Sequence, residues 1–104
     1  MENMFAGCNT LKEIRGINKF NSTNLKYISF MFKACYELKY LDLSNFNTSE
    51  VINMGGMFHE CNKLKEIKGI NKFNTNNVIN MTTMFQECNE LIFLNVLFIN
   101  IFNY

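Results

Sequence analysis

The sequence predicts a single α/β domain over residues 1–104, built as a short solenoid of stacked parallel strands and short helical turns. Its length of 104 residues allows one modest domain. Its four cysteines, at positions 8, 35, 61 and 88, stand 27, 26 and 27 residues apart, and large apolar residues recur with the same period. Such a period is typical of coils that bury their apolar edges against one another. The predicted coils are 4–30, 31–56 and 57–83, followed by a partial coil, 84–104.

Each coil is expected to begin with a helical turn and to continue into a strand. Met31, Cys35 and Leu38 have the i, i+4, i+7 spacing of one helix face, which predicts a short helical turn at the motif MFxxC. The following segment 41–43, Leu-Asp-Leu, alternates apolar and polar residues, as a strand does. Strands of successive coils should be parallel and about 4.8 Å apart, with right-handed connections.

The second half of each coil is predicted to turn at asparagines. Segments 47–50 and 74–77 are rich in Asn, Ser and Thr, whose side chains bond to the local backbone, and a second extended segment follows at 51–54 and 78–81. The 27-residue coils carry one extra residue, Gly16 or Gly69, where the 26-residue coil has only Asp42. Glycine suits such a bulge because it tolerates unusual φ and ψ angles.

Composition excludes several classes of function. Ten basic and nine acidic residues give a net charge of +1, without the basic excess that binds nucleic acid. The apolar segment 91–104 is shorter than the ~20 residues that span a bilayer, so we expect no transmembrane segment. It is interpreted as a capping strand pair, a subunit contact or a frameshifted remnant.

Met1 aligns with Ile28, Met54 and Met81 inside a coil and no export signal precedes it, so we expect a fragment or an internal start.

No catalytic, cofactor or metal site is predicted, and no small-molecule substrate. The cysteines lack the close spacing of zinc ligands, and stacked in register they are poorly placed for disulfides, so we expect buried thiols. Cys61 and His59 are the nearest approach to a nucleophile and its base. The alignment of the coils, however, predicts that Cys61 points inward while His59 is a solvated surface histidine.

The strings NMGGMFHECNKLKEI (53–67) and LDLSNFNTSEV (41–51) resemble the BspA-like leucine-rich repeat, over roughly residues 1–96. Phe46 stands where the general leucine-rich pattern has Asn or Cys, so the usual asparagine ladder is not carried over. The resemblance implies a leucine-rich-repeat solenoid, a cell-surface or secreted location, and adhesion to host or neighbouring-cell proteins without catalysis. The sequence itself fixes no location.

The outward residues of the main strand form the candidate partner-binding face. Because leucine-rich solenoids usually bind through this surface, the aromatic residues Tyr40 and Phe93 are the candidate anchors. The face comprises Glu13, Arg15, Tyr40, Asp42, Glu66, Lys68 and Phe93. A solvated charged face without a partner is the competing interpretation.

The leading hypothesis is therefore a non-enzymatic protein-interaction module, a segment of an adhesin-type surface protein. The alternative is a structural or non-functional fragment of a longer repeat array that self-associates end to end, because few coils leave a large end surface for a small core. A cysteine hydrolase that uses Cys61 and His59 is the third and weakest hypothesis.

Overall fold

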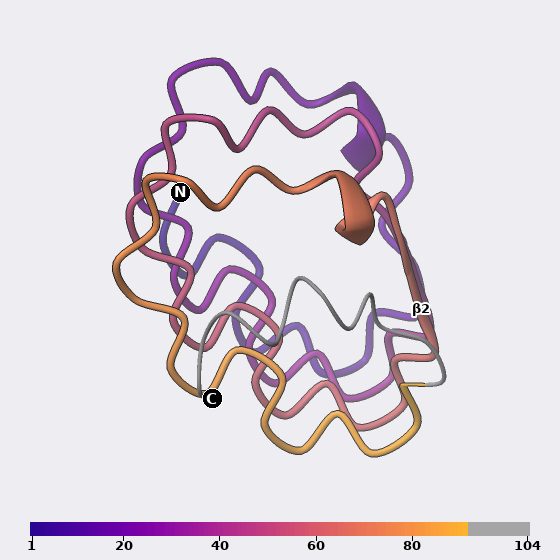
Figure 1. The fold of residues 1–104 in the computed structure, drawn as a ribbon. Helices are drawn as coiled ribbons and strands as arrows, with labels where there is room; N and C mark the ends of the chain where they lie inside the picture. The colour runs from indigo at the N-terminus through magenta and orange to yellow at the C-terminus, as the bar shows by residue number, and fades with distance from the viewer. Residues whose placement is uncertain (92–104) are drawn as a thin grey trace.

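The computed structural model describes residues 1–91, in which the backbone passes repeatedly around one core and each pass lies beside the next (Figure 1). Its regular elements are short. They are the 3-10 helix η1 (Ile17–Lys19), the strands β1 (Tyr40–Asp42) and β2 (Glu66–Lys68), and the 3-10 helix η2 (Ile70–Lys72). The strands pair in parallel, with Leu41 opposite Ile67. Single parallel bridges join Tyr27, Asn53 and Asn80 in the second extended segments.

The helical turn expected at MFxxC is not found, because the segment consists of hydrogen-bonded turns. The N–H of Met31 donates to the Ile28 carbonyl and that of Cys35 donates to the Phe32 carbonyl, with φ of 57° at Phe30 and 60° at Ala34. A positive φ at the third residue is the signature of a type II turn. In a helix the Phe32 N–H would bond within its own segment, but here it donates to the Met57 carbonyl of the next coil. The apolar spacing of a helix face is thus met by turns.

Hydrogen bonds between coils follow one rule along the MFxxC segments. In the backbone bonds each donor lies in the earlier coil and each acceptor in the later one, as with Phe5 to Met31, Phe32 to Met57 and Phe58 to Met84, at 2.8, 2.9 and 3.0 Å. Equivalent bonds form two residues before and two residues after these pairs. Residues 26 or 27 positions apart therefore lie side by side.

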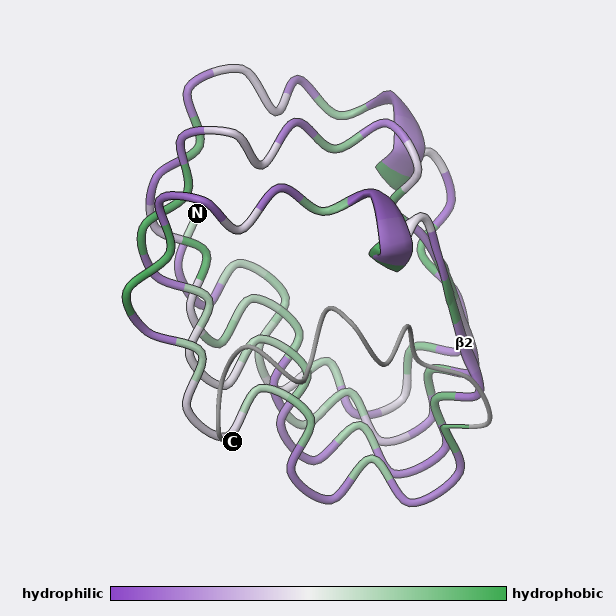
Figure 2. Ribbon diagram, in the orientation of Figure 1, coloured by the Kyte–Doolittle hydropathy of each residue, from purple (hydrophilic) through white to green (hydrophobic). Residues whose placement is uncertain are grey.

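Aromatic rings and thiols line the core beside these turns. The rings of Phe5, Phe32, Phe58 and Phe85 stack in order, with centroids 5.5, 5.7 and 5.6 Å apart. Hydrophobic residues recur at the same place in successive passes of the backbone (Figure 2). All four cysteines are free thiols, and each of the last three donates to the carbonyl of the preceding coil's phenylalanine, at 3.0–3.2 Å. Burial is the main cause that raises the pKa of Cys35 and of Cys88 to about 11.

The two extra glycines lie directly before η1 and η2. These two 3-10 helices were not predicted from the sequence. Gly16 and Gly69 have φ of 78° and 90°, the left-handed region that glycine adopts without strain. A side chain on Gly69 would meet the Cα of Ser44 at 2.4 Å, so only glycine fits this close approach. The 26-residue coil, 31–56, has no glycine at this turn. There the Asp42 carboxylate accepts hydrogen bonds from the backbone N–H and the hydroxyl of Ser44.

The predicted Asx turns are present. Asn47 and Asn74 each accept a bond from the backbone N–H two residues later, at 3.1 and 2.9 Å. Beside these turns Thr48 is buried. The Thr48 hydroxyl donates to the Asn74 carbonyl and accepts from the Asn74 N–H. Ser22 bonds in the same way to the next coil, to the Asn45 carbonyl and the Asn47 N–H. These polar ladders hold the register where the apolar core ends.

Candidate functional site

The outer face of strands β1 and β2 carries four of the residues predicted to bind a partner. Leu41 and Ile67, at the strand centres, are only 3% and 4% exposed, because alternate residues of a strand point to opposite faces. The side chains on either side of them face outward, and Tyr40 is 56% exposed. The parallel register sets Tyr40 beside Glu66, and Asp42 beside Lys68. One exposed aromatic ring therefore stands among alternating charges.

Asp42 is held in its charged form. Hydrogen bonds from the hydroxyl and then the backbone N–H of Ser44 lower the pKa of Asp42, and the charge of Lys68 adds to this effect. Because Asp42 also forms the turn that ends β1, its carboxylate supports the strand rather than standing ready for proton transfer. The opposite charges of Asp42 and Lys68 on adjacent strands favour the pairing.

A groove of about 450 Å³ runs along this face and extends to the first coil. It is lined by Glu13, Tyr40, Asp42, Glu66 and Lys68 from the predicted face. Its other lining residues are Lys12, Ile14, Lys39 and Leu41. Arg15 is not among them, and its Nε donates to Glu13 Oε1 at 2.8 Å on the exposed surface. Phe93, the second predicted anchor, and the C-terminal segment from 92 onward lie outside the described residues.

One ion pair joins two successive coils among residues 1–91. Lys63 Nζ lies 2.9 Å from Glu37 Oε1. The hydrogen bond and charge of Lys63 lower the pKa of Glu37, with smaller contributions from Lys12 and Lys39. This pair was not predicted from the sequence, although the two residues are 26 positions apart and the period alone could have placed them together.

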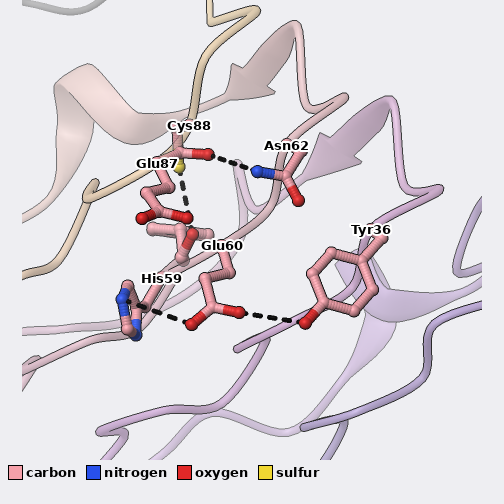
Figure 3. A network of polar contacts seen from close by, with 7 residues as sticks. Tyr36, His59, Glu60, Asn62, Glu87 and Cys88 are labelled. Carbon is pink, nitrogen blue, oxygen red and sulfur yellow. Dashed lines mark hydrogen bonds and ion pairs between the residues drawn. The ribbon is translucent and has the colours of Figure 1, made fainter.

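A second polar cluster joins Tyr36, Glu60 and His59 (Figure 3). The Tyr36 hydroxyl donates to Glu60 Oε2 at 2.9 Å, and this bond together with the negative charge raises the pKa of Tyr36. His59 Nε2 is 3.6 Å from Glu60 Oε1. The prediction of a solvated His59 was wrong, because its side chain is 19% exposed and its buried Nδ1 has no hydrogen-bond partner among residues 1–91.

Cys61 and His59 do not form a nucleophile and base. The Cys61 thiol is fully buried and donates to the Phe32 carbonyl at 3.0 Å, while His59 approaches Glu60. Burial is the largest cause that raises the pKa of Cys61, which disfavours the thiolate that such chemistry needs. This geometry gives the hydrolase hypothesis no support.

Residues 1–91 contain neither a metal-binding cluster nor a membrane-spanning helix. No group of three or more His, Cys, Asp or Glu side chains in this part of the chain could hold a metal ion. No helix in the same residues is long and apolar enough to cross a membrane.

Comparisons with known proteins identify the family. None of the curated proteins and none of the solved structures that were compared with the chain matches it. One family model, described as "Mycoplasma protein of unknown function, DUF285", matches residues 1–95. This match covers most of the 104 residues and includes every residue of the groove. The chain therefore belongs to the DUF285 family.

Proposed function

We propose that the chain is a non-enzymatic protein-interaction module, a segment of an adhesin-type surface protein that binds a protein partner through the outer face of β1 and β2. The observation that carries this proposal is the exposure of Tyr40, at 56%, on a strand beside a groove of about 450 Å³. Aromatic residues are enriched among the contacts that dominate binding energy. The charged residues around Tyr40 would supply the polar rim of such an interface.

We also propose that the fold is a short leucine-rich-repeat solenoid of the BspA-like type. Support comes from the parallel register of β1 and β2 and from the stacked phenylalanine rings, which recur at the repeat period. In such an array each unit contacts only its neighbours and presents its strands as one continuous surface. The resemblance then extends to function, namely adhesion to proteins of a host or a neighbouring cell.

The experiment that tests this function is a pull-down from host-cell surface proteins, followed by affinity measurement on the captured partner. Tyr40→Ala should weaken binding by tenfold or more, which is about 1.4 kcal/mol, without changing the melting curve. Tyr27→Ala is the matched control, because Tyr27 is 50% exposed and does not line the groove. Equal affinities of the two variants would contradict the proposed face.

End-to-end association of copies is the second candidate. Met4 is 48% exposed, and Phe5 stacks on Phe32, whereas Phe32 lies between two stacked rings. An apolar end surface of this kind favours association. Size-exclusion chromatography tests it, since a monomer over a wide concentration range would remove this candidate.

A further inference from the structure

The two edges of strand β1 are not equivalent. The residues that flank β1 bond to β2: the Lys39 carbonyl accepts from the Glu66 N–H at 3.4 Å, and the Leu43 N–H donates to the Lys68 carbonyl at 2.9 Å. In a parallel pair, alternate residues of a strand direct their backbone groups to the same neighbour. The N–H and C=O groups of Tyr40 and Asp42 therefore face away from β2, toward the first coil.

The first coil does not continue the ladder. If the first coil paired with β1 as β1 pairs with β2, the backbone of Tyr40 would bond to Lys12 and Ile14. The backbone of Asp42 would bond to Ile14 and Gly16. None of these four bonds is among the hydrogen bonds of residues 1–91. Two strong donors and two strong acceptors are thus left along this edge of β1.

The same two coils are bonded on their other side. At the MFxxC turns, the N–H groups of Asn3, Phe5 and Gly7 donate across to the second coil at 3.1, 2.8 and 2.8 Å. The open edge is therefore local to the strand side, where the groove lies between 12–14 and 39–42. Ile14, which aligns with the buried Leu41, is only half-buried there.

We propose that the open edge of β1 binds an extended peptide segment of the partner protein, which adds to the sheet as a strand through the backbone groups of Tyr40 and Asp42. Main-chain bonds of this kind give affinity with little dependence on sequence. The inference rests on the proposed function, because it specifies how a partner reaches the same face. Three residues of an extended strand span about 10 Å, which matches the length of β1.

The groove also specifies the chemistry of the segment. Lys12 and Lys39 both line it, and Glu37, a carboxylate whose pKa both lysines lower, is already ion-paired with Lys63 at 2.9 Å. An acidic side chain at this end would relieve the repulsion between the two lysines. The exposed ring of Tyr40 favours an apolar side chain beside it. The expected ligand is therefore an extended segment with an acidic end followed by alternating β-branched residues.

Amide hydrogen exchange of the free protein, followed residue by residue by NMR, tests the open edge. The Tyr40 and Asp42 amides should exchange at least tenfold faster than the Leu43 amide, which is bonded to Lys68. Protection of Tyr40 and Asp42 equal to that of Leu43 would show that the ladder is closed, and would overturn the inference.

Binding is tested with a fluorescent peptide of sequence Asp-Asp-Val-Thr-Val-Thr-Val, by fluorescence anisotropy. Tyr40→Pro removes the backbone donor and the aromatic ring and fixes φ in an extended range, whereas its control, Tyr40→Val, removes the aromatic ring and keeps the donor. Proline is tolerated at a strand edge whose N–H has no partner, so both variants should have the same melting curve. The proline variant should bind the peptide at least tenfold more weakly than the valine variant.

A peptide-side variation keeps the test decisive even where Tyr40→Pro does not fold. Methylating the backbone nitrogens of the valines in one peptide and of the threonines in another blocks alternate edges of the ligand strand. One methylated peptide should lose binding to the wild-type protein and the other should keep it. Equal binding of both, or failure of the parent peptide to bind at millimolar concentration, would overturn the inference.

The proposed function and this inference fail in different ways. If the captured partner is sensitive to Tyr40→Ala but binds Tyr40→Pro and Tyr40→Val equally, the face is a binding surface and strand addition is wrong. If no partner depends on Tyr40 at all while the peptide still binds at the open edge, the proposed surface function is wrong and the strand site remains.

Discussion

The stacked rings predict an unusually large cost for replacing one buried phenylalanine by leucine. Phe32 is fully buried and stacks on Phe5 at 5.5 Å and on Phe58 at 5.7 Å. Phe32→Leu keeps an apolar side chain but removes three carbon atoms from the core, which by itself costs roughly 1 kcal/mol. It also removes two ring pairs, each worth about 0.5–1.5 kcal/mol beyond the area buried. We therefore expect a loss of about 2–4 kcal/mol in the free energy of unfolding.

Phe46→Leu is the matched control, since Phe46 is also buried but has no ring stacked on it among the described residues. Both variants are measured by urea unfolding followed by circular dichroism, with the slope against urea compared to confirm that the same surface unfolds. A domain of this size has a total stability of only about 5–15 kcal/mol, so the difference is readily measured. If Phe32→Leu cost no more than Phe46→Leu, the ring column would not stabilise the stack as argued here.

Three further changes test other parts of the fold. Phe46→Asp should abolish cooperative unfolding in a circular-dichroism melt, because it buries an unpaired charge; a melt like that of wild type would contradict the core assignment. Gly69→Ala should destabilise by more than Gly16→Ala, because both have positive φ but only Gly69 is pressed against a neighbouring backbone; equal urea midpoints would contradict that contact. Raising the pH from about 9 to 11 should lower stability, because Cys35 and Cys88 have pKa values raised from 9.0 to about 11 by folding, and the unfolded thiols lose their protons first. Cysteine-to-serine variants should show a weaker decline in urea midpoint over this range.

The period of the sequence predicted neighbours well and local conformation less well. It placed Leu41 beside Ile67 and predicted the turns at Asn47 and Asn74, because side chains that stack must recur at the same position in every coil. It failed at MFxxC, since apolar spacing of i, i+4, i+7 is shared by a helix and by two successive turns. The glycines at Gly7 and Gly56, both with positive φ, were the signal for turns.

The open edge of β1 could not have been predicted from any residue. Segments 11–14 and 64–67 both read Leu-Lys-Glu-Ile, yet only the second contributes residues to a strand. Strand pairing depends on a neighbour at the right distance more than on intrinsic preference. The alternation of the strands predicted that Tyr40, Asp42, Glu66 and Lys68 lie on one face. The groove and the backbone groups without a partner in residues 1–91 are visible only in the three-dimensional structure.

The uniform direction of the backbone bonds between MFxxC segments gives these turns an electrical polarity. Because every backbone donor there lies in the earlier coil, the peptide dipoles of these turns add along the stacking axis instead of cancelling, much as they do in an α-helix. The turns near Met4 therefore direct carbonyl oxygens, and with them partial negative charge, away from the second coil. Two copies that met through their Met4 faces would bring like partial charges together, which disfavours a face-to-face pair of these ends.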